Sequence, residues 1–122
     1  MGAYAMLAMP KKEKYLQTHE VVLLESLYSW AEYKIIKEKF GASFKTIAVY
    51  ASPDIRFARL LKRKNWRPIE DREEFDRRDR TEIEGTDKGG PIAIADHTIT
   101  NEGSLDQFLS AIDDVMRKKK RR

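Results

Sequence analysis

The chain has 122 residues, 41% hydrophobic and 36% charged, so it can bury one core beneath an unusually polar surface. It contains no cysteine, which excludes disulfides, zinc–thiolate sites and cysteine nucleophiles. The formal net charge is +4, but the six basic residues of 117–122 exceed that, leaving −2 on the rest and no basic surface of the kind that nucleic-acid-binding modules use.

The apolar start of the chain does not read as a membrane anchor. Residues 1–9 are too few to span a bilayer, and they lack the basic beginning of a signal peptide. We therefore expect a cytoplasmic protein with no membrane partner. His19 and His97 are far apart in sequence and form no metal-ligand pair, so we expect no metal site built from histidine.

The first predicted elements are a strand and a helix. Residues 20–25 form a near-continuous apolar run, typical of a strand covered on both faces of a parallel sheet. Ser29 and Glu32 have the spacing of a capping box, in which each side chain satisfies an exposed amide at a helix start. The pattern predicts a helix over Trp30–Phe40, ended by Gly41.

A second strand and helix follow in the same order. Residues 44–50 form the second apolar run. Ser52 precedes Pro53, and proline is favoured at the first helical position because it loses no hydrogen bond there. A helix is predicted from Pro53 to about Lys64.

The next helix, predicted over about 70–84, is mostly charged. Acidic residues precede basic ones by four positions, an arrangement that adds a few tenths of a kcal/mol per pair. The three pairs are Glu73–Arg77, Glu74–Arg78 and Asp76–Arg80. Such a helix can stand away from the core as a lid; a plain solvated helix is the alternative.

The glycine-rich stretch 85–104 contains the third strand. Lys88 precedes Gly89 and Gly90, and Pro91 follows them, which is the wrong order for a phosphate-binding loop. We interpret the glycine pair as a hinge leading toward a strand at 97–100.

A second capping box, at Ser104 and Gln107, predicts a last helix over Leu105 to about Arg117. Three repeats of strand, short turn and capped helix indicate an α/β fold with a parallel sheet.

Two sets of residues suggest chemistry on position alone. Glu25 would end the first strand, where open α/β sheets place ligands, and it could orient magnesium or accept a proton. Its alternative is a solvent-exposed glutamate. Arg56, Arg59 and Arg63 share one helix stripe and could stabilise phosphoryl charge; the alternative is a solvated face neutralised by Asp54 and the lid-like helix.

Aromatic residues open the first helix beside that expected ligand edge. Tyr28, Trp30 and Tyr33 could wall a base or a pantetheine-like group, with core packing as the alternative for at least one of them.

Several segments together resemble dephospho-CoA kinase-like and adenylate-kinase-related P-loop proteins. They are LYSWAEYKIIKEKFG (27–41), SPDIRFARLLKR (52–63), RDRTEIE…KGGPIAIADHTITNEGS (78–104) and the closing helix. The most specific elements are L-Y-S-W-x-E-Y, G-G-P-I-A-x-A-D and N-x-G-S. The resemblance runs in order over nearly the whole chain.

The resemblance implies a three-layer parallel sheet of the nucleoside-monophosphate-kinase type with a helical lid. It implies ATP and Mg²⁺ as cofactors and a small-molecule phosphate acceptor. It assigns ATP phosphates to Arg59 and Arg63, and catalysis to Glu25, where such proteins usually carry aspartate followed by glycine. The remaining residues that it implies are the adenine border, Asn101, Gly103 and Ser104, and the acceptor site, Tyr28, Trp30 and Arg78.

The chain departs from that pattern because it contains no Walker loop, so it is expected to represent a kinase-like domain truncated at its N-terminus. We expect one domain over 1–117, a lid at about 65–90 and a basic tail at 118–122. Two functions are therefore carried forward. One is a nucleotide-binding phosphotransferase that is incomplete in this chain; the other is a non-catalytic oligomerisation or partner-binding module, completed by a second copy or by an N-terminal segment.

Overall fold

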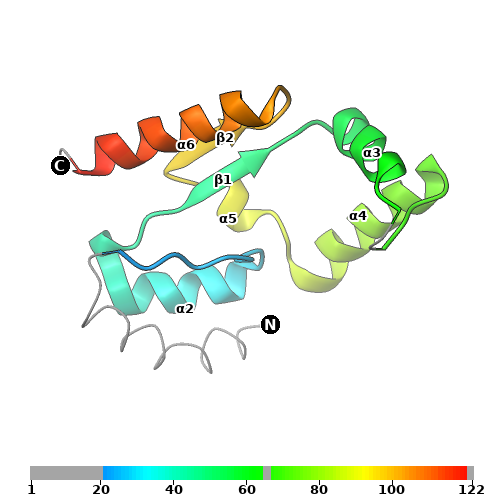
Figure 1. Cartoon of the computed structure of the whole chain (residues 1–122). Helices are drawn as coiled ribbons and strands as arrows, with labels where there is room; N and C mark the ends of the chain where they lie inside the picture. Colours follow the sequence, from blue (N-terminus) through cyan, green and yellow to red (C-terminus); the bar gives the residue numbers. More distant parts are fainter. Residues whose placement is uncertain (1–20, 65–66, 121–122) are drawn as a thin grey trace. The chain divides into compact units, whose positions relative to one another are not determined.

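The computed structural model describes residues 21–64 and 67–120 (Figure 1). In these residues the chain forms five α-helices, α2 to α6, one 3₁₀ helix, η1, and two parallel strands, β1 and β2. The predicted α/β class with a parallel sheet is confirmed at this level. None of the described helices is long and apolar enough to cross a membrane.

The chain divides into two compact units. One comprises Met1–Lys45 with Thr81–Ile94, and the other comprises Thr46–Arg80 with Ala95–Arg122. We call them the aromatic unit and the sheet unit, and each is described by itself.

In the aromatic unit, α2 spans Trp30–Phe40, as the sequence predicts. The Ser29 hydroxyl accepts a hydrogen bond from the Glu32 amide at 3.2 Å, which satisfies one of the exposed donors at the helix start. Gly41 ends the helix with a φ of 57°, a left-handed conformation that favours glycine, and begins η1 (Gly41–Ser43).

The predicted first strand is wrong for the residues that can be judged. Residues 21–28 have no regular secondary structure, and Glu20 lies outside the described residues. Val21 is 46% exposed and Leu23 78% exposed, so this apolar run is not covered on both faces. Strand formation depends on pairing and burial more than on composition, and the described part of the chain gives this run no strand partner.

The glycine pair begins a short helix that the sequence did not predict, α5 (Gly90–Ala93). Gly89 precedes it with a φ of 128°, which only glycine adopts readily. Gly90 lies so close to Trp30 that an added Cβ would be 2.8 Å from Cε3 of the indole. The glycines therefore turn the chain and bring α5 against α2.

In the sheet unit, β1 (Ile47–Tyr50) pairs in parallel with β2 (His97–Thr100). Two hydrogen bonds join the residues that precede the strands. The Asp96 carboxylate accepts from the Thr46 amide at 2.9 Å, and the Asp96 amide donates to the Thr46 hydroxyl at 3.2 Å. The strand predicted over 44–50 is thus shortened at its start, and the strand at 97–100 is confirmed.

Three helices complete the sheet unit. The first, α3 (Pro53–Lys62), begins at Pro53 as predicted, and α4 (Arg72–Thr86) continues from this unit into the other. The last, α6 (Leu105–Lys120), packs along β2 (Figure 1). The predicted helix ends are correct to within a few residues.

The core of the sheet unit is small. Its buried apolar side chains are Ala48, Ile69, Phe75 and Ile99. Phe75, on α4, is only 2% exposed and lies against Phe57 of α3, with ring centroids 5.5 Å apart.

Candidate functional site

The candidate site lies at the carboxyl edge of β1 and β2. The strands end at Tyr50 and Thr100, and each leads through a short loop into a helix, α3 or α6. Two helix N-termini therefore follow the same sheet edge. Aligned peptide dipoles contribute positive potential at each helix start, which favours an anion. Asp54 and Asp106, in the first turns of these helices, and the Glu102 carboxylate offset part of it.

Hydrogen bonds tie the loop 101–104 to β1 and α3. The Asn101 amide donates to the Tyr50 carbonyl, and the Arg59 guanidinium donates to the Asn101 carbonyl, each at 2.6 Å. The Glu102 carboxylate accepts from the Ser52 amide at 2.7 Å, at the start of α3. The loop is therefore preformed by its neighbours in the sheet unit.

The end of this loop is a complete capping box, as predicted. The Ser104 amide donates to the Gln107 side-chain oxygen at 2.9 Å, and the Gln107 amide donates to the Ser104 hydroxyl at 3.1 Å. A Cβ on Gly103 would lie 1.9 Å from that same Gln107 oxygen. Ser104 therefore caps α6, and Gly103 leaves room for the Gln107 side chain, whether or not either residue also contacts a ligand.

The arginine stripe of α3 divides into two kinds of residue. Arg56 forms an ion pair with Asp79 at 2.9 Å, so its charge is neutralised within the unit. Arg59 bonds the Asn101 carbonyl, and Arg63 bonds the Arg67 carbonyl at 3.4 Å. Among the described contacts, these two exposed guanidiniums have carbonyl partners and no carboxylate, so their positive charge is available to an anion.

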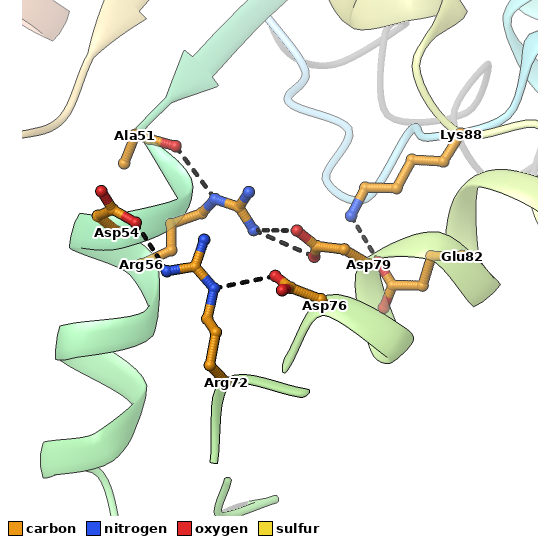
Figure 2. A network of polar contacts seen from close by, with 8 residues as sticks. All are labelled: Ala51, Asp54, Arg56, Arg72, Asp76, Asp79, Glu82 and Lys88. Carbon is orange, nitrogen blue, oxygen red and sulfur yellow. Dashed lines mark hydrogen bonds and ion pairs between the residues drawn. The ribbon is translucent and has the colours of Figure 1, made fainter. Parts of the chain in front are cut away.

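A second arginine joins α3 to the part of α4 in the same unit (Figure 2). Arg72 donates to Asp54 at 2.7 Å and to Asp76 at 3.0 Å. These hydrogen bonds raise the pKa of the Arg72 side chain, so the group stays charged. The guanidiniums of Arg72 and Arg56 also lie over the Phe75 ring, 5.4 and 5.1 Å from its centroid. This cluster joins two helices and has its charges paired internally.

Arg78 contributes to structure as well. It forms an ion pair with Glu74 at 2.6 Å, one of the predicted pairs on this helix. It also donates to the carbonyls of Arg67 and Pro68, in the segment before α4. In the described part of the chain, Asp76 pairs with Arg72 and not with Arg80.

The remaining predicted residues, Glu25, Tyr28 and Trp30, belong to the aromatic unit. Glu25 is exposed in an irregular segment, so the strand end that suggested a catalytic role does not form. The Trp30 ring stacks on Tyr33 at 5.1 Å and packs against Gly90.

Tyr28 forms a contact that the sequence interpretation missed. It is 49% exposed, and the Lys88 ammonium lies 5.0 Å from its ring centroid. Lys88 also pairs with Glu82 at 2.6 Å (Figure 2). An antiparallel bridge between Ser29 and Lys88 holds the two segments together. Because 59 positions separate these residues, no local sequence pattern predicts the contact between Tyr28 and Lys88.

At the sheet edge, the sequence interpretation missed Ser52 as an amide donor and Glu102 as its acceptor. The only local signal is an acidic residue next to the start of a helix. Its partner lies 50 positions away, beyond what a local pattern can indicate.

Comparison with known proteins gives relatives but no family model, because no model matches the chain. It is 37% identical over 116 residues to a UPF0200 protein of Pyrococcus furiosus, covering 94% of this chain and 62% of that protein. It is 38% identical over 113 residues to a UPF0200 protein of Thermococcus sibiricus, covering 92% and 59%. A UPF0200/UPF0201 protein of Archaeoglobus fulgidus is 32% identical over 118 residues, covering 97% and 36%.

These matches correct the family expected from the motifs. The relatives carry UPF0200 names, and none of these three is named a dephospho-CoA kinase or an adenylate-kinase-related protein, so that identification is wrong. The chain spans about three fifths of the Pyrococcus and Thermococcus proteins that it matches. Over nearly all of its own length, the chain is similar to archaeal UPF0200 proteins.

Proposed function

We propose that the chain is the nucleotide-binding part of an ATP-dependent phosphotransferase. The observation that carries this proposal is the sheet edge where two helix N-termini meet a loop held by Arg59. In open α/β sheets, ligands bind outside the carboxyl ends of the strands.

The charges at this edge suit a polyphosphate. In the proposal, Arg59 contacts the phosphates at the edge, and Arg63, which lies at the other end of α3, contacts those farther along the helix. Carboxylates neutralise neither of them within the described contacts. The peptide from Asn101 to Ser104 borders the base. Phosphoryl transfer depends mainly on positioning and on stabilising negative charge, which arginines and helix N-termini can provide.

Magnesium would be held mainly by the nucleotide. No group of three or more acidic or histidine side chains suited to a metal occurs in the described ranges. Mg²⁺ commonly binds through substrate phosphates, water and one or two carboxylates, so a nucleotide-borne ion is compatible with this edge. A three-layer sheet with a lid around 65–90, and an acceptor site at Tyr28, Trp30 and Arg78, also stay proposals.

Calorimetric titration of the whole chain with ATP and Mg²⁺ tests this function. We expect saturable binding, weakened about tenfold or more by Arg59→Ala or Arg63→Ala, because each change removes a charged donor. Lys62→Ala is the matched control: it removes an exposed positive charge from the same helix and should leave the affinity unchanged. Absence of binding at millimolar ATP would exclude the proposal.

A second function, assembly through a partner-binding surface, is favoured by the exposed apolar residues of β1. Ile47 is 39% exposed and Val49 52% exposed, although strands of parallel sheets are normally covered on both faces. Light scattering separates the two functions, because it detects assembly whether or not ATP binds.

A further inference from the structure

The hydrogen bonds of β1 reveal which of its backbone groups are directed away from β2. The Thr46 carbonyl accepts from the His97 amide at 3.1 Å, and the Tyr50 carbonyl accepts from the Asn101 amide at 2.6 Å. In a parallel ladder, alternate residues direct both backbone groups to the same neighbour. Thr46, Ala48 and Tyr50 therefore face β2, while the amides and carbonyls of Ile47 and Val49 point to the opposite edge. In the described residues, no strand pairs with that edge.

This edge lacks two of the features that keep edge strands apart. Residues 46–51 contain no charged residue and no proline, which are the usual protection against pairing with another chain. Ile47, Val49 and Tyr50 are 39, 52 and 48% exposed. On β2, by contrast, the apolar Ile99 is buried and the exposed residues are threonines.

We propose that a second copy of this chain pairs with β1, strand against antiparallel strand, about a two-fold axis at Ala48. In this register, Ile47 of one copy lies opposite Val49 of the other. Both residues direct their backbone groups outward, so each such pair can exchange both of its hydrogen bonds. A register shifted by one residue would place Ile47 opposite Tyr50, whose groups are already used by β2.

The side chains fit the same register. Residues opposite each other share a face of the sheet, so Ile47 and Val49 of both copies form one continuous apolar surface. Because residues 46–51 are uncharged, no like charges face each other across the axis. Each copy brings two strands, and the combined sheet of four falls in the commonest range of about four to six strands.

A contact about a two-fold axis requires a self-complementary surface, and this edge meets that requirement. The inference rests on the second proposed function, assembly, and is independent of nucleotide binding.

Charge variants at the two outward residues test the register. We expect a dimer by light scattering for the unchanged chain. The variant Ile47→Lys/Val49→Lys gathers four like charges at the axis and should be a monomer. The variant Ile47→Lys/Val49→Glu places opposite charges across each pair and should dimerise again. Thr98→Lys, on the exposed side of β2, is the control and should remain dimeric; circular dichroism checks that each variant is folded.

A disulfide provides a second measurement. The chain has no cysteine, so Ala48→Cys introduces a single thiol. At the axis the two Cα atoms would be about 4.5 Å apart, within the range of a disulfide. Mild oxidation should link Ala48→Cys chains in pairs and leave Thr98→Cys chains single.

A monomeric unchanged chain would overturn the proposal. If the double-lysine variant were still a dimer, β1 would be excluded as the contact surface, although assembly itself would be supported. Failure of ATP binding would leave all of these outcomes unaffected.

Discussion

Gly90 lies where even one added methyl group would meet the Trp30 ring. We expect Gly90→Ala to destabilise the protein by about 1–3 kcal/mol, because the ring would have to move within a packed contact. Gly85→Ala is the matched control, since a Cβ there meets nothing within 4 Å and alanine favours the helix by up to about 1 kcal/mol. Thermal unfolding measures the stability of both variants. If Gly90→Ala and Gly85→Ala had equal melting temperatures, the contact with Trp30 would tolerate a side chain.

The glycines and arginines also show how much of a single residue's role can be predicted from the sequence. The order of Lys88, Gly89 and Gly90 was sufficient to exclude a phosphate loop. The actual role of Gly90, its close approach to Trp30, depends on a residue 60 positions away. Likewise, the spacing of Arg56 and Arg59 places both on one stripe, but only three-dimensional contacts reveal that Asp79 neutralises the first.

At the level of elements, the start of α2 depends on one hydroxyl. We expect Ser29→Ala to lower stability by about 1 kcal/mol, because the Glu32 amide would lose its acceptor. Ser110→Ala, at an exposed position on α6, should have little effect. Denaturant unfolding of both variants checks the difference, and an unchanged midpoint for Ser29→Ala would mean that water replaces the cap.

The association of α3 with α4 in the sheet unit depends on Arg72. We expect Arg72→Gln to lower the melting temperature more than Arg77→Gln does, because only Arg72 bonds carboxylates on both helices. The difference should shrink in 1 M salt, which screens exposed ion pairs. A difference that persists in salt would point to packing on Phe75 as the main contribution.

Helices could be predicted well and the first strand could not, for a physical reason. Caps are local: Ser29, Pro53 and Ser104 act within a few residues, so their spacing predicts where helices begin. A strand needs a neighbour that sequence does not identify. The run 20–25 has the composition of a buried strand, yet its described residues are unpaired. The short helix α5 was missed because proline and glycine usually indicate a turn.

For the molecule as a whole, the sequence predicted the α/β class with a parallel sheet, but not the family. The motifs suggested a kinase, whereas the matched relatives carry UPF0200 names. Short motifs shared among α/β proteins often reflect common local structure, such as a capping box before a helix, and so they identify a fold more safely than an activity.

Glu102 has a consequence for any ligand at the sheet edge. Its carboxylate accepts from the Ser52 amide at the start of α3, and Glu102 is part of the loop proposed to border the base. A tethered group competes at a high effective concentration, so a weakly held anion such as chloride would be displaced by it. Only a ligand that engages several groups at once can take its place, and the loop must then shift as the ligand enters. In the proposed site, Glu102 therefore competes with incoming anions, and we expect the site to favour polyvalent anions over monovalent ones.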